Sequence, residues 1–235
     1  MQTMAVIDFE TTGMSPAAGA RATEIAAALV CNGRIVGRYQ SLMNAGAWVP
    51  PFIERLTGIS NAMLAEAPPA DQVMREVSAF VEGLPLVAHN AAFDRVFWRA
   101  ELALAGCVDD IGASGCEACR FACTLLLARR LYPEAPNHRL GTLAEWHDLP
   151  RFGRAHRAMA DAEVTAHLLC RMQRDIERRY AAELGDRVVD HALLQALQRS
   201  PRARLAAAFA APTPGSKRTG RRATAVRALS GFGTA

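Results

Sequence analysis

The sequence contains no run of about eighteen consecutive apolar residues, which is the length that a membrane-spanning helix requires. Its N-terminus leads from Met1-Gln2-Thr3 directly into a short apolar segment, without the charged and then apolar leader of a secretory signal. We therefore expect a cytoplasmic protein with no membrane partner. The six cysteines should then be reduced, so we expect no disulfide framework.

Extreme composition is also absent. Hydrophobic residues make up 51% of the 235 residues and charged residues 21%, which excludes collagen-like, fully disordered and coiled-coil chains. This length allows one large domain, or one domain with an appendage. We find no internal repeat.

Acidic residues are missing from the C-terminal end. After Ser200 the chain carries seven basic side chains and no acid, which leaves 20 of the 27 basic residues and all 23 acidic ones in the first 200 residues. A basic segment rich in Pro, Gly and Ala on a mildly acidic body is typical of a flexible arm for a polyanion. The alternative is a solvated terminus without a function, because blocks of like charge often only remain disordered.

The apolar pattern predicts strands early in the chain and helices that alternate with strands later. Strands are expected at 4–9, 23–30, 34–41 and 86–88, with Asn32-Gly33 as a hairpin turn. Helices are expected at 52–56, 73–81, 92–105, 121–132, 141–147, 156–179 and 187–199. This order predicts an α/β domain with a mixed central sheet flanked by helices. We expect that domain over 1–178, a helical extension over 179–200 and a basic, disordered tail over 201–235.

The first chemically notable segment is Asp8-Phe9-Glu10-Thr11-Thr12-Gly13, at the end of the first strand. Residues two apart on a strand point to the same side, so the carboxylates of Asp8 and Glu10 lie close together. Two such acids repel each other, and a divalent cation relieves the repulsion. Oxygen ligands favour Mg²⁺ or Mn²⁺.

Two further segments carry acids beside a histidine. In His89-Asn90-Ala91-Ala92-Phe93-Asp94, the acid falls in the first turn of a predicted helix, where the helix dipole favours it. In His156-Arg157-Ala158-Met159-Ala160-Asp161, a separation of five puts His156 and Asp161 on different helix faces. For both to reach one site, His156 must lie on the loop before the helix.

Each segment also has a structural interpretation. Asp8 and Glu10 are then a solvated strand end, Asp94 a helix-start residue, and His156 and Asp161 ordinary helix-surface residues. A single short motif is weak support for function. The three together, in this order and each after the expected element, favour a common site.

These segments resemble the three exonuclease motifs of the DEDD superfamily in its histidine-bearing branch, and most closely those of the epsilon-type proofreading exonucleases of bacterial DNA polymerase III. The resemblance covers about residues 4 to 172. It includes three further landmarks, which are Leu56-Thr57-Gly58-Ile59, Ala67-Pro68 and Ala128-Arg129-Arg130-Leu131-Tyr132-Pro133.

The resemblance implies a ribonuclease H-like fold and 3′→5′ hydrolysis of nucleic acid to nucleoside monophosphates. It implies that Asp8, Glu10, Asp94 and Asp161 are metal ligands for two Mg²⁺ or Mn²⁺ ions and that His156 is the general base. Two ions can activate a water and stabilise the leaving oxygen, and a histidine with a pKa near 6.5 suits a base near neutral pH.

Other residues are expected near the substrate. Thr11, Thr12 and Gly13 are candidates for hydroxyl and N–H contacts to the terminal nucleotide. Phe93 is a candidate for stacking on a base, although a core position is the more ordinary role for it. The arginines at 151, 154 and 157 are expected to contact phosphates or to be solvated.

The substrate class stays open at this stage. Single-stranded DNA 3′ ends are favoured, and an RNA exonuclease of the ribonuclease T or oligoribonuclease type is the alternative, because no residue decides the sugar. A scaffold subunit that docks a DNA polymerase is a further possibility. Separately, Cys107, Cys116, Cys119 and Cys123 have a spacing that admits a structural Zn²⁺ site, although Cys123 is also expected on the apolar face of a helix.

Overall fold

The computed structural model describes residues 2–107, 121–151 and 153–209, which fold around one mixed sheet. Its five strands lie in the order β3-β2-β1-β4-β5. The strands are β1 (Met4–Thr11), β2 (Ala22–Cys31), β3 (Arg34–Leu42), β4 (Leu86–Ala88) and β5 (Ala122–Cys123). The first three pair antiparallel, and β4 and β5 continue the sheet in parallel with β1. The predicted mixed sheet is confirmed.

The hairpin between β2 and β3 forms where the sequence predicted it. Asn32 and Gly33 both have positive φ values, of 51° and 70°. Two consecutive residues with positive φ make the turn whose twist matches the flanking strands, and Asn-Gly is its preferred pair.

One face of the sheet is covered by the helix α7 (Ala158–Arg179), which packs on β1, β2 and β3. Small residues line this contact on both sides, with Ala26 and Ala28 on the sheet and Ala158, Ala162 and Ala166 along the helix. Their spacing of four places the helix residues on one stripe. Because none of these side chains extends beyond Cβ, the first turns of α7 lie close to the sheet.

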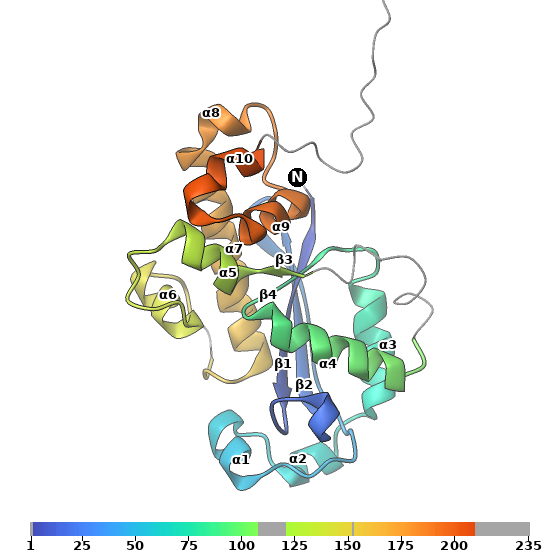
Figure 1. Cartoon of the computed structure of the whole chain (residues 1–235). Helices are drawn as coiled ribbons and strands as arrows, with labels where there is room; N and C mark the ends of the chain where they lie inside the picture. Colours follow the sequence, from blue (N-terminus) through green and yellow to red (C-terminus); the bar gives the residue numbers. More distant parts are fainter. Residues whose placement is uncertain (1, 108–120, 152, 210–235) are drawn as a thin grey trace, which may run out of the picture.

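The other face is covered by α3 (Ala70–Phe80) and α4 (Ala91–Leu104), as Figure 1 shows. Ile7 and Phe9 of β1 point to this side and pack with Phe97 and Trp98 of α4. The alternation along β1 therefore sends its odd-numbered residues to α4 and leaves Asp8 and Glu10 on the α7 side.

The remaining elements lie at the two ends of the sheet and beside α7. Near the carboxyl end of β1 are η1 (Pro16–Ala18), α1 (Pro51–Thr57) and α2 (Asn61–Ala65). Beside α7 are α5 (Thr124–Leu131) and α6 (Leu140–Trp146). The opposite end carries α8 (Ala181–Leu184), α9 (His191–Arg199), η4 (Arg202–Arg204) and α10 (Leu205–Phe209), close to the N-terminus (Figure 1).

Two details of the predicted elements were wrong. Residues 121–123 were expected to begin a helix, but Ala122 and Cys123 form β5 by pairing with Val87 and Ala88. The parallel edge of β4 supplies hydrogen-bond partners that the local sequence does not reveal, and the helix begins only at Thr124. The short helix α2 was not predicted at all.

The predicted tail was also wrong over its first residues. Leu205, Ala208 and Phe209 are buried in the core cluster that contains α7 and β1, and the ring of Phe209 stacks on Tyr180. The positive charges of Arg202 and Arg204 made the segment look like a solvated arm, but its apolar residues pack. The remainder of the predicted tail, and Cys116 and Cys119 of the proposed zinc site, fall outside the described residues.

Two cysteines of the predicted zinc site, Cys107 and Cys123, lie within the described residues. Cys123 is buried in the core as a strand residue and not on a helix face, while Cys107 packs at the edge of the same cluster.

Of the helices in the described ranges, none combines the length and the apolar character needed to cross a membrane.

We expect the C-terminal helices to contribute to stability. A chain that ends at Ser200 loses the buried side chains of Leu205 and Phe209, and the free energy of unfolding should fall by about 3–5 kcal/mol. A chain that ends at Phe209 is the matched control, because it keeps both side chains. Urea denaturation followed by circular dichroism measures both, and equal midpoints for the two truncations would contradict the packing of α10.

Candidate active site

Asp8 and Glu10 lie at the carboxyl end of β1, on the face that α7 covers. Glu10 is buried, and Asp8 is partly exposed. The strand register shifts between Glu10 and Thr11, so the chain leaves the regular ladder directly after the second acid. A bulge at this point re-aims the residues that follow.

Asp94 reaches the same place from the opposite side of the sheet. It lies in the first turn of α4 and is 2% exposed. Its Oδ1 accepts a hydrogen bond from the backbone N–H of Phe9, at 3.3 Å. Asp94 is thereby fixed against the residue between Asp8 and Glu10.

Asp161 and His156 complete the group. Asp161 lies in the first turn of α7, and the backbone N–H of His156 donates a hydrogen bond to its Oδ2, at 3.2 Å. His156 has a φ of 60° and precedes the helix, as the sequence required for both residues to share a site. Glu10, His156 and Asp161 each offer one ligand atom, and the three atoms lie within 4.8 Å of one another.

The acids are unfavourable as anions in this arrangement. Burial, with repulsion from Asp94, Asp161 and Glu10, holds the pKa of Asp8 well above its usual value. Burial also raises the pKa of Glu10 to about 8, together with the charges of Asp161 and Glu24, and that of Asp94 to about 8. The pKa of Asp161 is raised as well, mainly by burial. Buried acids that repel one another in this way are a donor set that fits hard divalent cations.

A fifth acid, Glu24, stands opposite Glu10 in the β1–β2 ladder and is fully buried. Its carboxylate accepts two hydrogen bonds from Arg157, at 2.7 and 3.0 Å, one from the N–H of Ala158, at 3.0 Å, and one from Gln40, at 2.8 Å. Burial alone raises the pKa of Glu24, but these hydrogen bonds outweigh it and leave the pKa lowered. Glu24 is therefore an anion that anchors the first residues of α7 to β2.

Sequence reasoning missed Glu24 and misjudged Arg157. A charged residue at an inward-facing position of an otherwise apolar strand was the available signal for Glu24. Arg157 is neither solvated nor free for phosphate, because it pairs with Glu24 beside Glu10. Arg154 also has a structural contact, since its guanidinium donates to the carbonyl oxygen of Arg55 at the end of α1.

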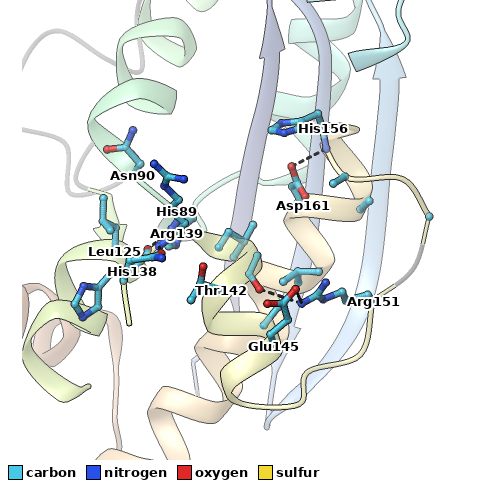
Figure 2. Close-up of a pocket in the computed structure, with 18 of the residues that line it drawn as sticks. His89, Asn90, Leu125, His138, Arg139, Thr142, Glu145, Arg151, His156 and Asp161 are labelled. Atoms are coloured by element: carbon cyan, nitrogen blue, oxygen red, sulfur yellow. Dashed lines mark hydrogen bonds and ion pairs between the residues drawn. The ribbon is translucent and has the colours of Figure 1, made fainter. Parts of the chain in front are cut away.

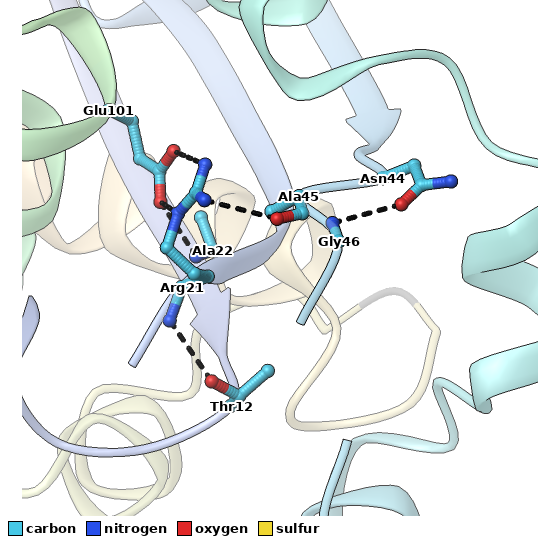
Figure 3. Close-up of polar contacts among 7 residues, drawn as sticks. All are labelled: Thr12, Arg21, Ala22, Asn44, Ala45, Gly46 and Glu101. Carbon is cyan, nitrogen blue, oxygen red and sulfur yellow. Dashed lines mark hydrogen bonds and ion pairs between the residues drawn. The ribbon is translucent and has the colours of Figure 1, made fainter. Parts of the chain in front are cut away.

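The loop after the acids is held by a second buried ion pair (Figure 3). Arg21 makes a bidentate pair with Glu101 of α4, at 2.9 and 3.0 Å, and Glu101 also accepts from the N–H of Ala22. The backbone N–H of Arg21 donates to the hydroxyl of Thr12, while the N–H of Thr12 donates to the carbonyl of Arg21. These contacts fix Thr12 relative to α4, which also carries Asp94.

The other predicted substrate residues have defined surroundings. Thr11 is buried and donates its hydroxyl to the carbonyl of Gly13, at 2.7 Å. The hydroxyl hydrogen of Thr12 remains available, because its oxygen acts as an acceptor. Phe93 is half-buried, and its ring lies 4.9 Å from that of Phe97, so it serves the core as the more ordinary interpretation expected.

His89 has a structural role. Nε2 donates to the carbonyl oxygen of His138, at 3.1 Å, which leaves Nδ1 to accept from the hydroxyl of Thr124, at 2.9 Å. Burial lowers the pKa of His89 to about 4, so the ring is neutral at physiological pH. His89 therefore joins the end of β4 to the start of α5 and to the segment 137–139.

A cleft of about 930 Å³ opens beside the acids. Figure 2 shows His89, Asn90, His138 and Arg139 on one wall, with His156 and Asp161 on the other. The lining of the cleft thus includes two of the residues that the sequence placed in the site, His156 and Asp161.

A mixed sheet in this order, with buried acids gathered at the carboxyl end of its first strand, defines a ribonuclease H-like fold. The chain belongs to the exonuclease family, since the family model described as Exonuclease (RNase_T) matches residues 5–169. This membership confirms the resemblance inferred from the three motifs.

Known proteins agree with this assignment. The chain is 40% identical over 164 residues to the 3′–5′ exonuclease DinG of Bacillus subtilis, covering 70% of this chain and 17% of that protein. It is 39% identical over 184 residues to a PolC-type DNA polymerase III of Halalkalibacterium halodurans, covering 77% and 12%. The structure of Exonuclease X in complex with 5′ overhanging duplex DNA is similar with a TM-score of 0.57 and 27% identity, over 73% of this chain and 91% of that one. The chain thus spans less than a fifth of the length of these two relatives.

We expect the Glu24–Arg157 pair to be among the strongest in the molecule. Replacing Glu24→Ala leaves Arg157 and the N–H of Ala158 without their acceptor, so the free energy of unfolding should fall by about 3–5 kcal/mol. Asp71→Ala, which breaks the exposed pair with Arg75, is the control and should cost less than about 1 kcal/mol. Urea denaturation measures the free energy of unfolding of both variants. Similar losses for the two would contradict the anchoring role of Glu24.

We also expect the metal-free protein to lose stability as the pH rises. Glu10 and Asp94 bind protons in the folded chain up to about pH 8 but release them near pH 4 in the unfolded chain. The folded state binds more protons between these values, so stability falls from about pH 4 to pH 8. Asp94→Asn should therefore stabilise the metal-free chain at pH 8.5, by about 1–2 kcal/mol.

Thermal unfolding in EDTA at pH 5.5 and pH 8.5 measures this effect. The control variant Asp186→Asn changes an exposed acid and should leave the melting temperature unchanged at both pH values. A lower melting temperature for Asp94→Asn at pH 8.5 would show that the carboxylate is not strained by burial.

Proposed function

We propose that this chain is a metal-dependent 3′–5′ exonuclease that hydrolyses single-stranded DNA ends to nucleoside 5′-monophosphates, as in proofreading or repair. The observation that carries the proposal is the convergence of Asp8, Glu10, Asp94 and Asp161 from three elements onto one point, with His156 beside them. The names of the relatives, a 3′–5′ exonuclease and a DNA polymerase, support the direction of hydrolysis and the choice of DNA.

The four carboxylates would hold two Mg²⁺ or Mn²⁺ ions. Such a pair activates the attacking water and stabilises the leaving oxygen. The raised pKa values of these acids support this assignment, because burial and, at Asp8 and Glu10, repulsion from neighbouring acids disfavour the anions, and bound cations would relieve that penalty.

His156 acts as the general base in this proposal. It takes the proton of the attacking water on a ring nitrogen, for which an imidazole near neutral pH is suited. Its side chain is exposed, and its left-handed backbone conformation directs it into the cleft across from Asn90. Among the hydrogen bonds of the described residues, His156 makes one, from its backbone N–H to Asp161. Its ring is therefore free to contact a substrate.

The terminal nucleotide binds beside the loop of Thr11, Thr12 and Gly13. Thr12 can donate its hydroxyl while Arg21 and Glu101 hold the loop in place.

Degradation of 5′-labelled oligonucleotides tests the proposal. The full chain should shorten single-stranded DNA from its 3′ end in Mg²⁺ or Mn²⁺ and not in EDTA. Asp8→Ala should lower the rate by at least about 10³-fold, while Asp186→Ala, at an exposed acid, should keep full activity. An RNA oligomer of the same sequence, degraded faster than DNA, would favour the ribonuclease T type of activity instead.

The absence of hydrolysis with every metal, in a folded chain, would overturn the proposal. A scaffold subunit that docks a DNA polymerase would then be the better hypothesis. The PolC relatives support such a partner for this chain, either in addition to the activity or in place of it.

A further inference from the structure

The cleft beside the acids does not end at His89. A second pocket of about 230 Å³ shares Asn90, Leu125 and Arg129 with it and extends to Arg95 and Gln198. The two pockets adjoin at these three shared residues, and we call the surface that they line together the upstream groove. It runs from His156 and Asp161 past the start of α4 to the side chain of Gln198 on α9.

We propose that the upstream groove binds the backbone of the substrate strand on the 5′ side of the scissile phosphate, with Arg129 and Arg139 as its phosphate-binding residues. This inference rests on the proposed exonuclease function and names the part of the site that grips the remaining strand.

The residues that line the groove indicate which part of the substrate strand it binds. Its lining includes His156 and Asp161 but none of Thr11, Thr12, Gly13 or Phe93. Since the proposed function places the terminal nucleotide beside Thr11, Thr12 and Gly13, we infer that the groove takes the strand on the other side of the carboxylates. Because the scissile phosphate must lie at the carboxylates, the part of the strand that enters the groove is the part that remains after hydrolysis.

Charge favours a polyanion in this groove. Arg95, Arg129, Arg139 and Arg151 line it, and apart from Asp161 the only lining acid is Glu145, which pairs with Arg151. Within the described ranges, the guanidinium groups of Arg129 and Arg139 make no ion pair or hydrogen bond, although most arginines around the active site do. Exposed guanidinium groups without a protein partner are suited to phosphates.

Rigid walls support the same interpretation. His89 joins β4 to Thr124 and to the carbonyl of His138, so Asn90 and Arg139, the next residues along the chain, stand on connected segments. On the far side, Gln198 pairs with β5 by accepting from the N–H of Cys123 and donating to the carbonyl of Phe121. The groove is therefore preformed and needs little ordering to bind a strand.

Binding of a 5′-fluorescein-labelled dT12 by the full chain, in an Asp8→Asn background with Mg²⁺, tests the groove. We expect Arg129→Gln and Arg139→Gln each to weaken binding about fivefold and to lower the salt slope by about 0.7. Arg34→Gln is the matched control, because Arg34 is exposed in the hairpin at the opposite end of β1, and it should change neither quantity.

Kinetics with the Asp8-containing chain give a second readout. The ratio of KM for p-nitrophenyl thymidine 5′-phosphate to KM for dT12 measures how much the upstream strand contributes, because the ester has none. We expect Arg129→Gln and Arg139→Gln to reduce this ratio about fivefold, with Arg34→Gln unchanged.

The possible outcomes separate the two proposals. Affinities and salt slopes equal to those of Arg34→Gln would overturn the upstream groove even if the chain is an active exonuclease. If neither substrate is hydrolysed, the proposed function fails, while the dT12 affinities and slopes still decide whether the groove binds the strand.

Discussion

The gathering of four acids at the carboxyl end of β1, where burial and neighbouring charges disfavour their anions, is the constraint on which the structure of this site depends. Burial raises the pKa of Asp8, Glu10, Asp94 and Asp161, and at Asp8 and Glu10 the charges of neighbouring acids raise it further. Left to local forces, such acids would turn towards solvent. The surrounding elements have to supply the packing energy that keeps them together.

Two ion pairs, Glu24–Arg157 and Arg21–Glu101, hold the elements of the site together. Glu24 and Arg157 fix the start of α7 on β2, which places Asp161 and His156. Arg21 and Glu101 fix the loop after β1 against α4, which carries Asp94. Each pair joins a segment of the site to an element that reaches the core, so the acids are held by contacts that no single motif contains.

The C-terminal helices extend this arrangement beyond the residues that the family shares. The family match ends at residue 169, yet α9 and α10 pack in the same core as β1 and α7. Gln198 also completes the exposed edge of β5 by pairing with its backbone groups. An open sheet edge is a liability for a protein, and here a helix covers it at the end of the upstream groove.

Local patterns in the sequence predicted the strands β1 to β4, the Asn32-Gly33 turn, most helices and the five residues of the candidate site. These features follow from spacing along the chain, because alternation, turn residues and helix-start acids act over a few residues. The sequence even required His156 to precede its helix, since five residues span one and a half turns. Only the tertiary structure decided that Ala122 and Cys123 form a strand, that Glu24 anchors Arg157, and that α10 packs instead of extending into solvent. Each of these depends on a partner far away in the sequence. No local sequence pattern indicates a buried ion pair, a strand edge or a core contact.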